Sequence, residues 1–150
     1  MATEIERKFM VEDMSFKDMA VSSSRITQGY LSPDKEATVR VRTRDDHGYL
    51  TVKGPNKGAV RSEWEYEIPI DDAIQMLSLS RTRVLDKTRY IVPYDGHNWE
   101  VDEFHGALEG LILAEIELPS EDTEVSLPPF VGREVTGDTA YYNSALAMGR

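Results

Sequence analysis

A charge pattern near the start of the chain is the first feature that could carry chemistry. In the segment Thr3–Val11, Glu4, Glu6 and Lys8 follow one another at intervals of two residues. If this segment is a strand, the three side chains share one face, because side chains alternate along a strand. Two neighbouring carboxylates repel one another unless water solvates both or a cation lies between them. The pattern therefore indicates either a solvated surface or a metal site.

Several later segments alternate strictly and carry charges that are sorted by sign. Basic side chains share one face of residues 37–44 and 86–92, and acidic side chains share one face of residues 61–70, 98–104 and 111–118. The residues are Arg40, Arg42, Arg44, Lys87, Arg89, Glu63, Glu65, Glu67, Glu100, Asp102, Glu115 and Glu117. Solvated faces usually mix signs, because neighbouring like charges destabilise a sheet. Taken together, the segments favour a shared charged interior with the apolar faces packed outside.

Such an interior could bind a metal ion and a phosphate chain. Carboxylate oxygens are hard ligands that suit Mg²⁺ or Mn²⁺. Lysine and arginine match phosphate oxygens, and a guanidinium group can do so with two parallel hydrogen bonds. The candidate ligands are Glu4, Glu6, Glu115 and Glu117, and the candidate phosphate-binding bases are Arg40, Arg42, Lys53, Lys87 and Arg89. These bases and one metal ion would offset most of the charge of a tripolyphosphate.

Composition limits the class of protein. The 150 residues fit one domain, 1–150, with a substantial core. A net charge of −10 argues against a general nucleic-acid binder. The absence of cysteine excludes disulfides, thiolate metal sites and a cysteine nucleophile. No apolar leader opens the chain, and no apolar run approaches the roughly 20 residues of a membrane span, so we expect a cytoplasmic protein without membrane partners.

The order of the segments predicts an α+β fold. Short alternating runs separated by turns such as Asp45–Gly48 and Pro93–Gly96 are typical of antiparallel hairpins. An apolar stripe after Asp71 predicts a helix capped by that residue. Residues 139–148 predict a closing helix with Asp138 as its cap. The pattern alone leaves open whether the strands form a barrel or a sandwich.

A set of ordered motifs resembles those of a known family. Residues 4–8, EIERK, resemble the ExExK signature of the CYTH superfamily, the triphosphate tunnel metalloenzymes. The later motifs, in the family's order, are RVR at 40–42, TVKG at 51–54, RxExE at 61–65, KxR at 87–89, the Asp102 of VDEF, AEIEL at 114–118 and EVTGDTAYYN at 134–143. One charged pentapeptide would be weak support for the resemblance, whereas this series of motifs spans nearly the whole chain. The length resembles that of the short bacterial members.

The resemblance implies a fold and a set of site residues. The fold is an eight-stranded antiparallel β-barrel with a charged lumen, flanked by a few helices and either open at both ends or partly plugged by the C-terminal helix. By motif position, the implied metal ligands are Glu4, Glu6 and Glu117, together with Glu115 and Asp102. The implied phosphate-binding residues are Lys8, Arg40, Arg42, Lys53, Lys87 and Arg89.

The expected reaction is hydrolysis of a triphosphate, assisted by Mg²⁺ or Mn²⁺. A second metal ion, or Glu63 and Glu65 directly, would position and deprotonate the attacking water. Tyr30 and Lys8 could face one another across adjacent strands and move a proton or orient water, although Tyr30 could equally be an aromatic side chain without chemistry. Inorganic tripolyphosphate is favoured over ATP, because no aromatic side chain is clearly placed to stack on a base.

Other functions fit the same residues. Within enzymes, the alternatives are a class IV adenylyl cyclase and a nucleoside or thiamine triphosphatase. A non-catalytic module that binds polyphosphate or a nucleotide would also use these charges. The expected partner is in each case a small triphosphate and not a nucleic acid, and the exposed walls of a barrel could support a homodimer.

Overall fold

Strands dominate the computed structural model, which describes residues 2–149. The strands are β1 (Ala2–Val11), β2 (Ser22–Ser32), β3 (Thr38–Arg44), β4 (His47–Lys53), β5 (Val60–Ile68), β6 (Leu85–Tyr94), β7 (His97–Phe104), β8 (Ile112–Glu117) and β9 (Val131–Glu134). The helical elements are α1 (Phe16–Met19), α2 (Ile70–Leu77), α3 (Asn143–Ala147) and the 3₁₀ turns η1 (Gly106–Leu108) and η2 (Thr139–Tyr141). Within residues 2–149, no helix is both long and apolar enough to cross a membrane.

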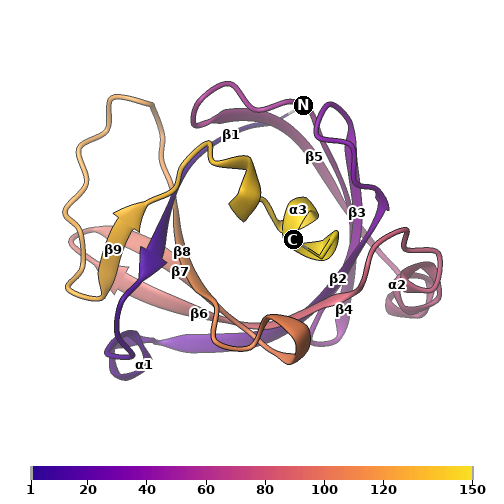
Figure 1. Ribbon diagram of the computed structural model, residues 1–150, viewed down its shortest axis with the longest axis horizontal. Coiled ribbons are helices and arrows are strands. Elements are labelled where there is room, and N and C mark those ends of the chain that lie inside the picture. Colours follow the sequence, from indigo (N-terminus) through magenta and orange to yellow (C-terminus); the bar gives the residue numbers. More distant parts are fainter. Residues whose placement is uncertain (1, 150) are drawn as a thin grey trace.

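Eight of the strands close into an antiparallel barrel, as predicted. Their hydrogen-bonded order is β5-β4-β3-β2-β6-β7-β8-β1, and β1 returns to pair with β5. Figure 1 looks into this barrel. Only the first half of β1 pairs with β5, whereas Phe9 and Val11 on the same edge pair with β9. The sequence pattern does not anticipate β9. The hairpin turns predicted between β3 and β4 and between β6 and β7 are confirmed.

The larger apolar core lies outside the barrel wall. Phe9 of β1 and Trp99 of β7 are buried on this side, with ring centroids 5.5 Å apart. Phe16 of α1 and Phe130, which precedes β9, are also fully buried in this cluster. Figure 1 shows α1, β9 and the connection before β9 on the outer side of the wall. The predicted arrangement, with apolar faces outside and charged faces inside, is confirmed.

Helix α2 covers another part of the outer wall, against β3 and β4. A close approach at Gly48 makes this possible, since a Cβ atom there would lie 2.6 Å from Cβ of Ala73. The predicted cap of this helix is wrong. Pro69 occupies the N-cap position, and Asp71 lies in the first helical turn, where its negative charge favours the helix dipole.

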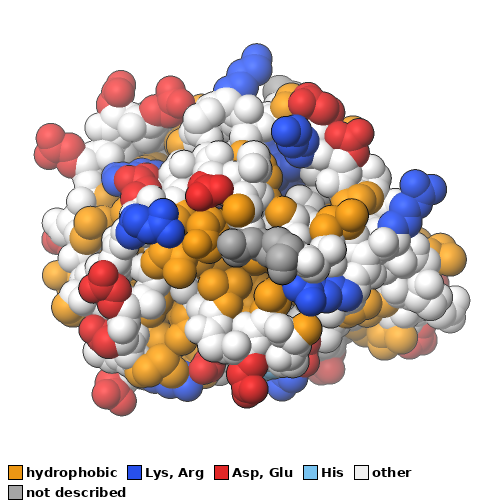
Figure 2. All heavy atoms as spheres, viewed as in Figure 1, with side chains coloured by type: hydrophobic (Ala, Val, Ile, Leu, Met, Phe, Trp, Pro, Cys, Tyr) orange, Lys and Arg blue, Asp and Glu red, His pale blue; other side chains and the backbone are white. Residues whose placement is uncertain are grey.

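The C-terminal segment enters the barrel and forms a second, smaller core. Leu146 and Ala147 of α3 pack against Tyr30, Leu85 and Phe104 on the inner face of the wall. Figure 1 shows α3 within the ring of strands. In the same view, Figure 2 shows hydrophobic side chains gathered around this end of the chain. The C-terminal segment therefore closes part of the barrel interior.

The predicted continuous helix over residues 139–148 is wrong. Asp138 does act as a cap, because its carboxylate accepts a hydrogen bond from the Ala140 amide at 3.0 Å. However, the turn that it caps is η2, and Tyr142 is extended, with ψ 139°. The extended residue separates η2 from α3. Arg83 then fixes α3 by donating a 2.8 Å hydrogen bond to the Leu146 carbonyl.

Candidate active site

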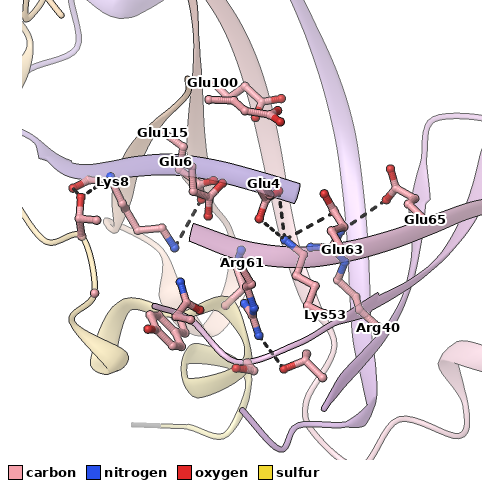
Figure 3. A pocket seen from close by; sticks show the side chains of 18 of the residues that line it. Glu4, Glu6, Lys8, Arg40, Lys53, Arg61, Glu63, Glu65, Glu100 and Glu115 are labelled. Atoms are coloured by element: carbon pink, nitrogen blue, oxygen red, sulfur yellow. Dashed lines mark hydrogen bonds and ion pairs between the residues drawn. The ribbon is translucent and has the colours of Figure 1, made fainter. Parts of the chain in front are cut away.

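A cavity of about 260 Å³ lies inside the barrel, and its lining is mainly charged. Within residues 2–149, seven acidic and seven basic side chains contribute to it. They are Glu4, Glu6, Glu63, Glu65, Glu100, Glu115, Glu117, Lys8, Arg40, Arg42, Arg44, Lys53, Arg61 and Arg89. Figure 3 shows acidic and basic side chains from neighbouring strands converging on this space. Strand alternation places them there, because each strand turns every second side chain inward.

Four carboxylates on β1 and β8, the acid cluster, gather on one side of the cavity. They are Glu4, Glu6, Glu115 and Glu117. Glu6 and Glu117 are paired across the two strands. Burial and the charges of Glu115 and Glu4 raise the pKa of Glu6 well above its usual range. Burial and the charges of Glu4 and Glu100 also raise the pKa of Glu117. Among the described residues, no cation pairs directly with either Glu6 or Glu117.

The other two members of the acid cluster have basic partners. Lys53 Nζ lies 3.0 Å from a Glu4 oxygen, and Lys8 Nζ lies 3.4 Å from a Glu115 oxygen. Burial alone would raise the pKa of Glu115, but the charges of Lys8 and Arg89 lower it to about 2. Within the described residues, the acid cluster therefore contains two carboxylates with a directly paired cation, Glu4 and Glu115, and two without one, Glu6 and Glu117.

The acid cluster suits a hard divalent cation by its chemistry. The pKa of Glu6 is raised although Lys53 and Lys8 oppose the shift, so negative charge is in excess around it, and a cation between the carboxylates would offset that excess. No three acidic side chains within residues 2–149 already converge as a complete metal-binding group. The donor type and the excess negative charge fit Mg²⁺ or Mn²⁺, with water or substrate oxygens completing the coordination.

Arginines from β3 line the opposite side of the cavity. Arg40 and Arg42 are largely buried and point in the same direction. Burial and the charge of Arg40 lower the pKa of Arg42 to about 10. The Nε atoms of both arginines are buried and have no hydrogen-bond partner within the described part of the chain. Two neighbouring cations that line the same cavity are suited to an anionic ligand.

A second group of buried charges, the deep ion cluster, consists of Lys87, Arg89 and Asp102. The Asp102 carboxylate accepts two hydrogen bonds from Arg89, at 2.8 and 3.0 Å, and lies 2.7 Å from Lys87 Nζ. Burial opposes ionisation of Asp102, but the two cations lower its pKa far below its usual range. Burial lowers the pKa of Lys87 to about 8, despite the attraction of Asp102. These charges are paired with one another, although Lys87 Nζ makes no hydrogen bond of good geometry within the described residues.

Residues 2–144 match the CYTH domain. The chain belongs to the CYTH family. An inorganic triphosphatase from Acetivibrio thermocellus is 48% identical over 147 residues, which cover 97% of this chain and 94% of that protein. One from Nitrosomonas europaea is 37% identical over 151 residues, covering 97% of each chain. The crystal structure of an inorganic triphosphatase superposes with a TM-score of 0.73 at 34% identity, covering 100% of this chain and 97% of that one.

The CYTH barrel brings most of the predicted site residues to one cavity. Those that line it are Glu4, Glu6, Lys8, Tyr30, Arg40, Arg42, Lys53, Glu63, Glu65, Arg89, Glu115 and Glu117. Lys87 and Asp102 belong to the deep ion cluster and do not line the cavity. The prediction that Tyr30 and Lys8 lie on adjacent strands is wrong, because β2 and β1 are not neighbours in the sheet. Both side chains instead reach the cavity from different parts of the wall.

Three further charged residues line the cavity of this CYTH domain and were not predicted as site residues. They are Arg44, Arg61 and Glu100. Each shares its strand face with a predicted residue, so alternation alone could have identified all three. By contrast, Tyr142, Asn143 and Ser144 reach the cavity from the C-terminal segment. No periodic signal in the sequence marks these positions.

Proposed function

We propose that this CYTH protein is an inorganic triphosphatase that cleaves tripolyphosphate to pyrophosphate and phosphate with the help of Mg²⁺ or Mn²⁺. The observation that carries the proposal is the juxtaposition, in one cavity, of carboxylates with raised pKa values and of neighbouring arginines. The relatives named inorganic triphosphatases, which align over nearly the whole chain, support the same activity.

The acid cluster would hold the metal ion. Glu4, Glu6 and Glu117 would supply carboxylate oxygens, and Glu115, which influences the pKa of Glu6, would be a further ligand. A bound divalent cation supplies charge stabilisation for the phosphate oxygens during transfer. Asp102 is a less suitable ligand than the sequence suggests, because Lys87 and Arg89 already occupy its carboxylate.

The basic side chains would bind and orient the phosphate chain. Arg40, Arg42 and Arg89 each present a guanidinium group to the cavity, while Lys8 and Lys53 add ammonium groups. In phosphoryl transfer, positioning and charge stabilisation provide most of the catalysis. The apolar contacts of α3 exclude water from the adjoining part of the barrel, which strengthens these electrostatic interactions.

Glu63 and Glu65 have different surroundings and therefore different proposed roles. Glu65 is held by Arg42 at 3.1 Å and by the Thr51 hydroxyl at 2.7 Å. Glu63 lies 3.7 Å from Lys53, and burial together with nearby Glu4 raises its pKa. A carboxylate with a raised pKa is a better proton acceptor. In this scheme the Glu63 carboxylate takes a proton from the attacking water, and Glu65 orients the arginines.

The direct test is phosphate release from tripolyphosphate, ATP and thiamine triphosphate, each with Mg²⁺, Mn²⁺ or EDTA. Glu6→Ala should abolish turnover, whereas Glu121→Ala, at an exposed position on the connection before β9, serves as the matched control. Metal-dependent release that is fastest with tripolyphosphate supports the proposal. Cyclic AMP formation from ATP would indicate a cyclase, and tight tripolyphosphate binding without release would indicate a binding module.

A further inference from the structure

One row of side chains crosses three neighbouring strands at the basic side of the cavity. Arg40 on β3 is paired with Thr51 on β4, and Thr51 is paired with Glu65 on β5. Directly opposed side chains on neighbouring strands lie about 5 Å apart. Arg40 and Glu65 are thus two strands apart and can meet only above the residue between them. Thr51, which is short and fully buried, occupies that position.

The Thr51 hydroxyl connects the two ends of this row. It donates a 2.7 Å hydrogen bond to Oε1 of Glu65 and accepts a longer one, 3.4 Å, from Nη2 of Arg40. The same Glu65 oxygen lies 3.1 Å from Nη2 of Arg42 and 3.6 Å from Nη2 of Arg40. One carboxylate oxygen therefore engages two arginines and a hydroxyl group.

The position of this oxygen matters because the two arginines repel one another. Arg40 and Arg42 share a strand face, and both are largely buried. A negative charge between them offsets that repulsion. The glutamate side chain is about one third exposed and has several rotatable bonds. Without a fixed partner it would lose side-chain freedom on meeting the arginines, whereas the buried threonine holds it in place.

We propose that Thr51 is a positioning residue for phosphate binding: its hydroxyl group fixes Glu65 against Arg40 and Arg42, and Glu65 in turn holds the two guanidinium groups in the orientation that binds the phosphate chain. The inference rests on the proposed function, since it takes tripolyphosphate as the ligand. Both arginines line the cavity, so the orientation of their guanidinium groups decides how they meet the ligand.

The test compares Thr51→Val, which keeps the side-chain volume but removes the hydroxyl group, with Thr51→Ser, which retains it. Thr27→Val is the matched control, because Thr27 forms a hydroxyl hydrogen bond with Thr43 elsewhere in the same sheet. Two quantities are measured for each protein. One is the Kd of tripolyphosphate in EDTA by calorimetry, which reports the basic side chains without metal, and the other is the pair kcat and KM with Mg²⁺.

We expect Thr51→Val to raise Kd and KM about tenfold, the size expected for losing a hydrogen bond to a charged group, with a smaller change in kcat. The Kd and KM values of Thr51→Ser and Thr27→Val should remain close to those of the unmodified protein. In a Glu65→Gln background, Thr51→Val should add little further loss, because both changes remove the same support. A purely structural role of Thr51 would not produce these three results together: a rise in KM for Thr51→Val, a normal KM for Thr51→Ser, and a double variant no worse than Glu65→Gln alone.

Two results would overturn the assignment: a Kd in Thr51→Val equal to that in Thr27→Val, or full additivity of the Thr51 and Glu65 changes. If Thr51→Val does not fold, Thr51→Ala, which also lacks the hydroxyl group, is compared with Thr51→Ser instead. Failure of the proposed function has a different signature. The unmodified protein would then bind tripolyphosphate without releasing phosphate, and the Kd values would still decide the role of Thr51.

Discussion

The acid cluster and the deep ion cluster place charges on neighbouring strands of the same barrel, yet they differ in burial and in how those charges are compensated. In the deep ion cluster, Asp102 accepts hydrogen bonds from Arg89 and forms an ion pair with Lys87, which is fully buried. In the acid cluster, Glu6 and Glu117 face one another with raised pKa values. The contrast predicts that loss of Asp102 mainly costs stability, because it would leave the buried Lys87 without a counter-charge, whereas loss of Glu6, which has no directly paired cation among the described residues, mainly costs ligand binding.

Among variants that alter one of the two clusters, the largest expected effect is the loss of catalysis on removing a charge from the acid cluster. Glu6→Gln removes one charge from the acid cluster and should lower metal-dependent kcat/KM for tripolyphosphate at least about 1,000-fold, equivalent to about 4 kcal/mol of transition-state stabilisation. The variant should fold normally, because the lost charge had no directly paired cation among the described residues. Steady-state phosphate release measures the loss, and near-normal turnover would refute the assignment of Glu6.

The deep ion cluster should show its largest response in stability. Asp102→Asn leaves Lys87 and Arg89 buried without their shared counter-charge. Breaking a buried ion pair in this way typically costs about 3 kcal/mol or more. Urea denaturation of the metal-free protein should therefore show a loss of this size for Asp102→Asn and little loss for Glu6→Gln. Equal stabilities of the two variants would remove the distinction between the clusters.

Metal binding should couple to stability through the acid cluster alone. At a free Mg²⁺ concentration about 100 times Kd, binding to the folded state should add about 2.7 kcal/mol to the free energy of unfolding. A thermal melt of the unmodified protein should show the corresponding rise in Tm. The rise should vanish in Glu6→Gln and persist in Asp102→Asn. A rise that survives in Glu6→Gln would place the metal elsewhere.

The smallest expected effect is on the pH dependence of stability. A carboxyl group whose pKa is raised by folding binds its proton more tightly in the folded state, so protonation favours that state. As pH falls through the raised pKa of Glu6 towards the ordinary glutamate value of 4.5, the metal-free protein should gain stability, and it should lose that gain as pH rises again. Below this range, protonation of Glu115 and Asp102, whose pKa values are lowered, reverses the trend.

Glu6→Gln is the control for this effect. Because glutamine does not titrate, the variant should lack the share of the pH dependence that comes from position 6, while keeping the loss at lower pH. Urea midpoints measured across the pH series would reveal the difference. Identical pH profiles for the two proteins would mean that folding does not raise the pKa of Glu6.

Alternation in the sequence was sufficient to predict the charged interior. Glu4, Glu6 and Lys8 face inward because a strand repeats every two residues, and the same rule applies to Arg40 and Arg42. Alternation does not predict how far along the barrel axis each inward side chain lies, because that position depends on the stagger between strands. For that reason the sequence did not distinguish Lys87 and Asp102 from the residues that line the cavity.

Features that depend on tertiary contacts were also beyond the sequence pattern. Strand β9 forms because the second half of one β1 edge is free of β5 and can accept a partner. The extended conformation of Tyr142 interrupts a segment whose composition favours a helix, and α3 is fixed by packing against the inner wall. The row from Arg40 through Thr51 to Glu65 likewise requires the register of three strands.

Calorimetric titration of Mn²⁺ into the unmodified protein, Glu6→Gln and Asp102→Asn would test the division between the two clusters most directly. Unfolding curves recorded alongside would establish that each variant is folded at the temperature used. The unmodified protein and Asp102→Asn should bind Mn²⁺, and Glu6→Gln should not. Unchanged Mn²⁺ binding by Glu6→Gln, or its loss in folded Asp102→Asn, would contradict the assignment of the metal to the acid cluster.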